Sequence, residues 1–242
     1  METPTFQPFG ERAILVTWEA FIKPDIHENV VNFDRMILQK FGKEILETVI
    51  TYQSLAIYLT HGIQLNKFIK ELKSSYATMK TAEHSFPSHL ITIPVCYDAH
   101  FAPDIEYVAH ENNVLVEEVI GLHSEPIYKV YFMGFLPGFP YLGGLNERIH
   151  TPRKTKPERS IPKGSVGIGG KQTGIYPNES PGGWHIIGRS PMSFFDAVKN
   201  PPTFIQAGDY VKFESVAKEE FEHIKTLVIN DLYFPNKMPY HD

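Results

Sequence analysis

The chain has 242 residues and a formal net charge of −5, so it suits one large domain or two small ones and does not resemble a general nucleic-acid binder. Its single cysteine, Cys96, excludes an intrachain disulfide and indicates a reducing compartment. No apolar run reaches the roughly 18 residues of a membrane span, and the N-terminus lacks the basic segment of a signal peptide. We therefore expect a cytoplasmic protein that binds neither nucleic acid nor membrane.

The first third of the chain predicts the order strand, helix, strand, strand, helix, strand. Residues 13–18 form a short apolar run, and the apolar residues of 24–41 recur at helical spacing behind Pro24, which can open a helix. Two strands follow at 45–51 and 55–59, then an amphipathic helix at 64–75 and a strand at 89–95. This order predicts a ferredoxin-like, split βαβ domain over residues 1–85, although the strand at 89–95 is free to pair with either domain.

A polar, proline-containing stretch at 80–88 is the predicted linker. Behind it we expect helices at 103–112 and 116–121 and a strand at 127–133. Further along, turn signals come every few residues, which favours an all-β, barrel-like domain over residues 86–242. A stretch at 214–227 is compatible with a helix, and the tail at 235–242 should be loose. The predicted class is therefore α+β.

One stretch of the second domain has the composition of a ligand pocket. Between Phe132 and Asp196 lie twelve of the 17 glycines, interleaved with aromatic side chains. From Gly134 to Asp196 there are eight Lys or Arg against four Asp or Glu, so this stretch carries +4 in a chain of −5. Glycine permits close approach of the backbone, while aromatic walls and a few cations suit a compact anion. We predict a pocket for a small anionic molecule here.

The familiar short motifs of catalysis are missing from this stretch. A phosphate loop would need glycine where Ser165 stands and Ser or Thr where Gln172 stands, so both tests fail. The glycines there form either a nest of backbone N–H groups around an anion or a closely packed β corner. The histidines lack zinc-type spacing, so we expect no metal. His123 is either a positioned proton donor or a capping or core-edge histidine, and no catalytic residue can be named from the sequence.

Several residue types in the stretch suit recognition of a small acid. Arg153 follows a proline and is the first candidate for a carboxylate fork, and Arg189 is the second. Tyr141 and Tyr176 each offer a hydroxyl group, while Trp184 is either a wall of the pocket or a core residue. The full set of predicted pocket residues is Phe135, Gly138, Tyr141, Arg153, Ser165, Gln172, Tyr176, Gly182, Gly183, Trp184 and Arg189.

Longer motifs occur in a fixed order along the same stretch. They are Gly134-Phe135-x-Pro137-Gly138-Phe139-x-Tyr141-Leu142, Pro162-x-Gly164-Ser165-Val166, Gln172-Thr173-Gly174-Ile175-Tyr176-Pro177, Ser180-Pro181-Gly182-Gly183-Trp184 and Ile187-Gly188-Arg189. In these motifs the chain resembles the PxpB and KipI family, which contains the B subunit of 5-oxoprolinase and is also called allophanate hydrolase subunit 1. In one departure, Glu158 follows Pro157 where that family often has arginine, and the arginine is displaced to Arg159. A role for that second arginine is therefore not carried over, whereas Arg153 keeps its place.

The resemblance implies a small N-terminal α/β domain followed by a cyclophilin-like β-barrel domain. It implies two partners, a C-subunit homologue (KipA/PxpC-like) and a lactam-cleaving A-subunit homologue. It also implies ATP, bound by this chain or by a partner. The leading hypothesis is a hydrolase subunit, inactive alone, of an ATP-dependent 5-oxoprolinase that opens 5-oxo-L-proline to L-glutamate.

Two alternatives stay open beside this hypothesis. One is a KipI-type inhibitor that binds a sensor histidine kinase through the same groove and has no chemistry of its own. The other is an amide-metabolising subunit of the allophanate hydrolase or urea carboxylase type. The leading hypothesis agrees with the composition at one point, because 5-oxoproline is a small carboxylate and the predicted pocket is cationic and aromatic.

Overall fold

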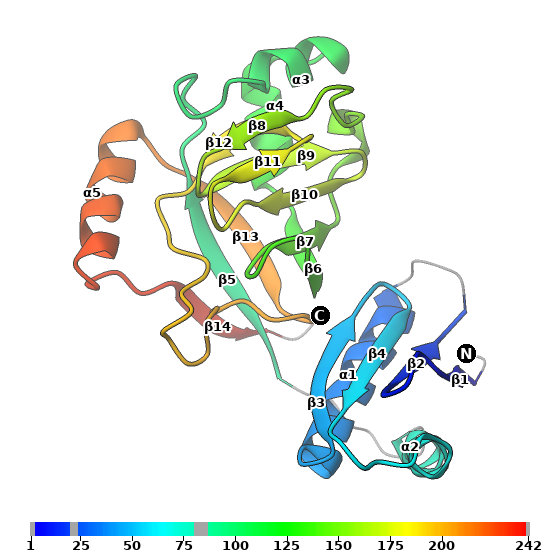
Figure 1. Ribbon diagram of the computed structural model, residues 1–242. Coiled ribbons are helices and arrows are strands. Elements are labelled where there is room, and N and C mark those ends of the chain that lie inside the picture. The colour runs from blue at the N-terminus through cyan, green and yellow to red at the C-terminus, as the bar shows by residue number, and fades with distance from the viewer. Residues whose placement is uncertain (1–2, 20–23, 80–86, 241–242) are drawn as a thin grey trace. The chain divides into compact units, whose positions relative to one another are not determined.

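The structure is a computed structural model that describes residues 3–19, 24–79 and 87–240. The chain divides into two compact units, Met1–Pro87 and Ser88–Asp242 (Figure 1). The boundary expected between residues 85 and 86 falls in the predicted linker, of which residues 80–86 lie outside the described part, so that boundary stays a prediction. Within the described residues, no helix is both long and apolar enough to cross a membrane.

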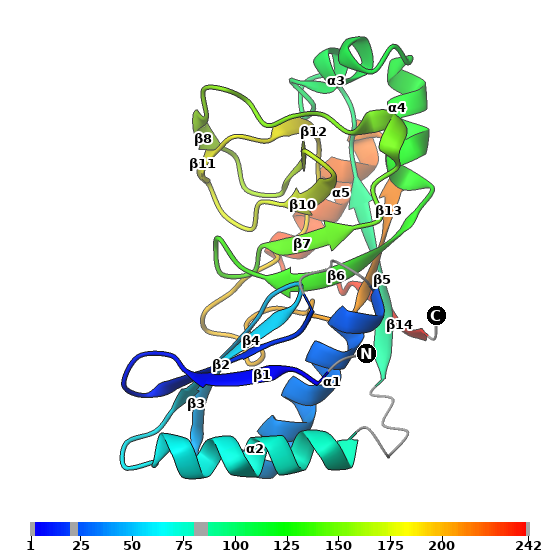
Figure 2. The same ribbon diagram turned by 90° about the vertical axis from the view of Figure 1, so that its right-hand side faces the viewer.

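The first unit contains four strands and two helices, all of them labelled in Figure 2. They are β1 (Thr5–Pro8), β2 (Ala13–Thr17), α1 (Pro24–Phe41), β3 (Ile45–Ile50), β4 (Ser54–Leu59) and α2 (Leu65–Met79). In β4, Leu55, Ile57 and Leu59 are buried while the residues between them are not, as expected for a sheet packed on one face. Helix α1 packs on β3 and β4, and α2 packs on β1 and β2. The four strands and two helices therefore enclose one apolar core.

The sheet of this unit corrects the predicted ferredoxin-like order. Its strands lie in the order β1-β2-β4-β3, all antiparallel. The place expected for the strand at 89–95 is taken by β1, which pairs with β2 through a tight turn that contains Gly10 at a φ of 71°. A hairpin closes locally, so β1 reaches this edge of the sheet at a small cost in chain entropy.

The second unit contains all the remaining elements. They are β5 (Ser88–Val95), α3 (Ile105–Glu111), α4 (Val116–Ser124), β6 (Ile127–Met133), β7 (Pro140–Gly143), the 3₁₀ helix η1 (Glu147–Ile149), β8 (Glu158–Ile161), β9 (Ser165–Gly169), β10 (Gln172–Ile175), β11 (Ser180–Gly182), β12 (His185–Arg189), β13 (Tyr210–Ser215), α5 (Lys218–Ile229) and β14 (Asn236–Tyr240). The strand expected at 127–133 is confirmed. The helix expected at 214–227 begins only at Lys218, because β13 continues to Ser215.

A mixed eight-stranded sheet organises this unit, in the order β12-β9-β10-β7-β6-β13-β5-β14. Strands β5 and β13 are parallel, and every other neighbouring pair is antiparallel. A separate two-stranded sheet joins β8 and β11. The class is therefore α+β, as predicted. The tail is not loose as expected, because β14 forms an edge strand on β5.

The closed barrel expected for this unit is not formed by continuous strand pairing. Strands β12 and β14 are the edges of the sheet, and beyond the end of β5 a single isolated bridge links Cys96 to Arg189, the last residue of β12. Two backbone hydrogen bonds make this bridge, at 2.9 and 3.0 Å. We therefore describe the sheet as open, with β5 and β12 in contact at one point.

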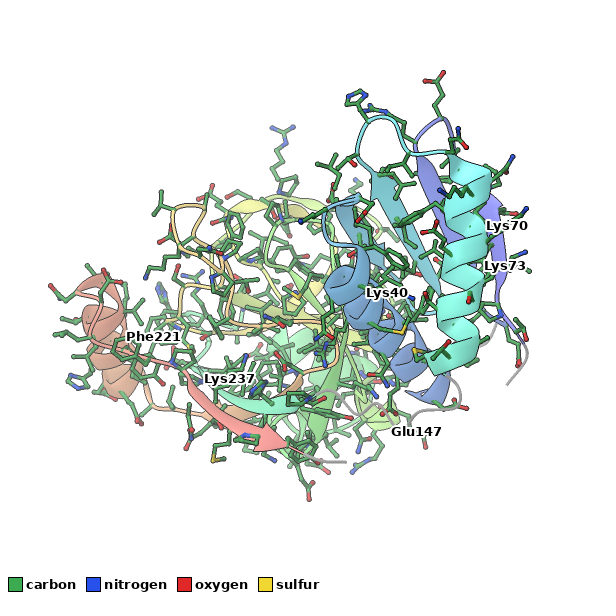
Figure 3. All side chains as sticks on the ribbon, turned by 90° about the horizontal axis from the view of Figure 1, so that it is seen from below. Lys40, Lys70, Lys73, Glu147, Phe221 and Lys237 are labelled. Carbon is green, nitrogen blue, oxygen red and sulfur yellow. The ribbon has the colours of Figure 1, made fainter. Side chains whose placement is uncertain are left out.

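Helices α3, α4 and α5 pack at different places in this unit. Helix α3 packs on β12 and α4 packs on β13, and the two helices also contact each other. Helix α5 packs through Phe221, labelled in Figure 3, whose ring lies 4.3 Å from that of Phe101 in a small cluster with Cys96 and Val216. The main core is a large group of buried aliphatic and aromatic residues between the sheet and α3 and α4.

Candidate functional site

A cavity of about 360 Å³ opens among the loops at one side of the second unit. Five of its eleven lining residues are aromatic, and its size suits a small molecule. Seven of the eleven predicted pocket residues line it, namely Phe135, Tyr141, Arg153, Tyr176, Gly182, Gly183 and Trp184. A second hollow, of about 430 Å³, lies between residues 192–204 and the end of α5 and contains none of the predicted residues.

The aromatic wall is a set of rings packed edge to face. Phe139 is at the centre, with its ring centroid 5.2 Å from that of Tyr176 and 5.5 Å from that of Trp184. Tyr141, on β7, lies 5.9 Å from Trp184 in the same type of contact. Edge-to-face pairs of this kind add to the stabilisation from burial alone. The wall is therefore a rigid surface against which a flat ligand can lie.

Two glycines allow the rings to approach the backbone this closely. A Cβ atom on Gly169, in β9, would lie 2.4 Å from Nε1 of Trp184. A Cβ atom on Gly182, in β11, would lie 2.4 Å from the hydroxyl oxygen of Tyr176. Both distances are far below van der Waals contact, so the positions of Trp184 and Tyr176 require glycine at these two sites.

Phe135 stands at the mouth of the cavity in an unfavourable backbone conformation. Its φ is 65°, in the left-handed region that bulky residues rarely occupy. Its side chain is 59% exposed, and its ring meets those of Phe139 and Tyr176 edge-on. Strain combined with exposure of a large apolar ring is typical of a residue kept for binding rather than for packing.

Arg153 provides the unpaired positive charge of the cavity. It lies in the segment between η1 and β8, with its guanidinium carbon 5.7 Å from the centre of the Trp184 ring. No carboxylate in residues 3–19, 24–79 and 87–240 forms an ion pair with it. Stacking on an aromatic face leaves the edge of the guanidinium available for a planar, two-oxygen acceptor. The cavity can therefore take a carboxylate at this point.

Lys154, the next residue, is neutralised by the protein itself. Its Nζ lies 2.8 Å from Oδ2 of Asp104 and 3.1 Å from Oε1 of Glu158. Burial lowers the pKa of Lys154, but the hydrogen bonds to the two carboxylates outweigh burial and hold this pKa above its ordinary value. Lys154 is thus a structural cation, and Arg153 is the cation left for a ligand.

Both tyrosines of the wall keep their protons. Burial raises the pKa of Tyr176 to about 12, against the opposing effect of a backbone hydrogen bond from Trp184. Burial also raises the pKa of Tyr141, although the nearby Arg153 charge partly offsets this rise. At neutral pH both side chains are therefore neutral phenols that can donate a hydrogen bond to a carbonyl oxygen.

The remaining four predicted pocket residues lie outside this cavity. Gly138 forms the turn between β6 and β7 at a φ of 83°. Ser165 is fully buried in β9, and Gln172 begins β10 opposite Gly169. Arg189 stacks on Phe101 at 5.6 Å, so the two predicted arginines do not share a site. Strand alternation and turn geometry, which composition does not reveal, place these four residues away from this cavity, and their role in binding stays a prediction.

His123 lies in the core, and both of its ring nitrogens are bound to protein groups. The Thr173 hydroxyl donates its single hydrogen to the Gly167 carbonyl at 3.0 Å. The Thr173 oxygen must therefore accept the second bond, which Nε2–H of His123 donates at 2.9 Å. Nδ1 then accepts from the Tyr97 hydroxyl at 2.8 Å. Burial lowers the pKa of His123 to about 3, so the ring stays neutral. Every polar atom of the ring is satisfied inside the core.

The glycine-rich segment around β9 does not form an anion nest. Strand β9 is hydrogen-bonded to β10 on one side and to β12 on the other, so its N–H groups are used within the sheet. Of the two interpretations left open above, the packed β corner is the one found. Within the described residues, no group of three or more His, Cys, Asp or Glu side chains is placed to hold a metal ion.

The predicted set missed four residues of the cavity wall: Phe139, Lys154, Pro157 and Pro181. Three of them had a visible signal. Phe139 belongs to the same Gly-Phe-x-Pro-Gly-Phe motif as Phe135, Pro181 directly precedes Gly182 in the Ser-Pro-Gly-Gly-Trp motif, and Lys154 adjoins Arg153. Pro157 gave no signal, because only the folded loops bring it to the aromatic rings.

Comparison with known proteins places the chain in a defined family. Residues 4–205 match the family described as "Carboxyltransferase domain, subdomain C and D", and the chain belongs to that family. It is similar to the B subunit of 5-oxoprolinase from Bacillus subtilis, with 50% identity over 136 residues, which is 56% of this chain and 57% of that protein. It is also similar to the B subunit of 5-oxoprolinase from Haemophilus influenzae, with 43% identity over 171 residues, 71% of this chain and 79% of that protein.

Among solved structures, the chain is similar to that of the protein TTHA0988, with a TM-score of 0.75 and 28% identity. The match covers 85% of this chain but only 40% of TTHA0988. The match to the Bacillus subtilis protein likewise spans little more than half of that protein.

Proposed function

We propose that this chain is the B-type subunit of a 5-oxoprolinase and that its cavity binds 5-oxo-L-proline. The similarity to two 5-oxoprolinase B subunits supports the assignment. The observation that carries it is Arg153, an unpaired guanidinium on Trp184 at the wall of an aromatic cavity. Its fork suits the carboxylate of the ligand, the rings suit the flat lactam, and the neutral phenols of Tyr141 and Tyr176 suit the lactam oxygen.

The proposed role is binding and orientation of the lactam. Opening the ring adds water to the lactam carbonyl and breaks the C–N bond, giving the amine and the side-chain carboxylate of glutamate. Among the described residues, the cavity wall has no carboxylate and no imidazole that could move a proton in this step. We therefore assign bond cleavage to a partner of the A-subunit type, with a C-subunit homologue completing the complex.

We also assign ATP to a partner protein. The aromatic cavity offers one unpaired cation, and the glycine-rich strand β9 has no free N–H groups for a triphosphate. These residues do not fit the nucleotide.

Two measurements test this function. Calorimetry should show that 5-oxoproline binds better than 2-pyrrolidone, which lacks the carboxylate, and better than proline, which lacks the lactam oxygen. Co-expression with the A-type and C-type partners should give ATP-dependent release of glutamate from 5-oxoproline. Equal affinity for the three ligands, together with no glutamate from the full complex, would reject the proposal.

We also propose that residues 1–85 and 86–242 fold as separate domains, the second one cyclophilin-like with its sheet left open. The two compact units and their separate apolar cores support this division. Expression of residues 88–242 alone should give a cooperatively unfolding protein. A molten product would argue against it.

A further inference from the structure

Arg153 lies over the Trp184 ring although no ion pair among the described residues holds its side chain there. This side chain is exposed. A long side chain loses much rotamer freedom when it is fixed. A guanidinium held over Trp184 by the protein alone therefore needs a rigid backbone beneath it.

Two hydrogen bonds fix the backbone on both sides of Arg153. The carbonyl oxygen of Pro152 lies 3.0 Å from Nε2 of His185, and because a carbonyl only accepts, Nε2 carries the hydrogen. The N–H of Lys154 donates to the carbonyl oxygen of Gly183 at 2.7 Å. One bond joins the two backbones and the other joins the His185 side chain to the Pro152 carbonyl. Together they hold the backbone of Arg153 beside Trp184.

A second set of contacts holds His185 and Lys154 from behind. The His185 ring stacks on Tyr107, with 4.6 Å between ring centroids and 10° between planes. Asp104 binds Lys154 at 2.8 Å and accepts from the backbone N–H of Ile186 at 2.7 Å. Burial lowers the pKa of His185, so its ring stays neutral and keeps the Nε2–H form. The start of α3 thereby clamps both chain segments that carry Arg153 and Trp184.

We propose that His185 is a positioning residue, which sets Arg153 over Trp184 through its hydrogen bond to Pro152 and its stacking on Tyr107. The sequence patterns gave no sign of this role for His185. The ligand part of this inference rests on the proposed binding of 5-oxoproline, whereas the positioning part concerns the free protein alone.

Two substitutions of His185 distinguish the effect of its hydrogen bond to Pro152 from the effect of its ring stacking on Tyr107. His185→Gln keeps an N–H group near the position of Nε2. His185→Phe keeps the ring on Tyr107 but removes the donor. We expect His185→Phe to weaken binding of 5-oxoproline about tenfold, the order expected for one lost hydrogen bond in the support of the site. His185→Gln should restore most of that affinity. A thermal melt of each variant shows whether it is folded.

A readout without ligand makes the test independent of the proposed function. The chain has two tryptophans, so the protein labelled with 5-fluorotryptophan gives two fluorine resonances, and Trp18→Phe or Trp184→Phe assigns them. Arg153→Met should shift the Trp184 resonance, because it removes the cation over that ring. His185→Phe should shift it in the same direction, and Arg153→Met should then add little in the His185→Phe background.

The outcomes are distinct. If Arg153→Met shifts the Trp184 resonance equally with and without His185, Arg153 does not depend on His185 and the inference is overturned. If the fluorine cycle behaves as expected but 5-oxoproline does not bind, the positioning role stands and the proposed function fails. If His185→Phe does not fold, Tyr107→Leu replaces it, because Tyr107 is 49% exposed. Tyr107→Leu should then give a smaller shift in the same direction, and no shift would overturn the proposal.

Discussion

Substitution of Gly169 by alanine gives a sharp test of the aromatic wall. Gly169 lies in β9, paired with Gln172 of β10, in an extended conformation that alanine adopts easily. The new Cβ atom, however, would lie 2.4 Å from Nε1, 2.5 Å from Cδ1 and 2.6 Å from Cε2 of Trp184. All three atoms belong to one rigid ring, so the whole indole must move away from β9 or the strand must shift.

The cost follows from the overpacking of a filled site. Forcing extra atoms into a packed core costs about 1–3 kcal/mol. For a protein of this size, each kcal/mol lowers Tm by roughly 2–4 °C. We expect Gly169→Ala to lower Tm by roughly 2–12 °C and to weaken 5-oxoproline binding, because Trp184 is displaced from the cavity wall.

The matched control is Gly121→Ala in helix α4. A Cβ atom on Gly121 meets nothing within 4 Å, and alanine is a better helix former than glycine by about 1 kcal/mol. This control should therefore raise Tm. Thermal unfolding by circular dichroism and calorimetric titration measure both effects. An unchanged Tm and unchanged affinity for Gly169→Ala would show that Trp184 is not held against β9 as described.

Three further predictions concern charge. Arg153→Ala should weaken 5-oxoproline binding by about tenfold or more in isothermal titration, while Tm stays constant. Arg153→Lys should restore only part of the lost affinity, because lysine lacks the two-pronged guanidinium. Full affinity in Arg153→Ala would remove this residue from the site. Burial raises the pKa of Asp34 from 3.8 to about 6, which opposes folding by about 3 kcal/mol at neutral pH and not at all below about pH 4. Asp34→Asn should thus raise the free energy of unfolding at pH 7, with the gain vanishing on acidification, and a gain independent of pH would contradict this reasoning. His123 has a folded-state pKa of about 3 against an ordinary 6.5, so it contributes stability that is complete above about pH 6.5 and is lost as the pH falls toward 3, at about 1.4 kcal/mol per pH unit. Because the Asp34 contribution has the opposite sign between about pH 4 and 6, the His123 slope is measured as the difference in free energy of unfolding between the wild type and His123→Phe, from urea titrations between pH 4 and 8. A difference that does not change with pH would refute this account of His123.

The sequence predicts the local elements better than their long-range partners. Helix α1 occupies the predicted range 24–41, because apolar spacing and Pro24 are local signals. The pairing of β5 with β13 joins residues more than a hundred positions apart, which no local pattern reports. The tail was expected to be loose because chain termini are often poorly ordered. An edge strand nevertheless tolerates Pro239, since its missing N–H can face away from the neighbour.

In the candidate site, too, the residues marked by local sequence were predicted and those set by long-range contacts were not. Glycines and aromatics close together in sequence marked the cavity, and Arg153 was recognised from its rigid setting after proline. Arg189 was chosen for its charge, but its position at the end of β12 places it over Phe101. His185 went unnoticed because its importance lies in a contact with Pro152, 33 residues earlier in the chain.

The small cluster around Cys96 makes this thiol a reporter of local opening. Cys96 is the one thiol of the chain, it is almost fully buried, and burial raises its pKa. Its side chain lies among Phe101, Val216 and Phe221, the last of them on α5, so a thiol reagent reaches the sulfur only when these side chains separate. The rate of thiol labelling therefore measures how often α5 opens from the end of β5.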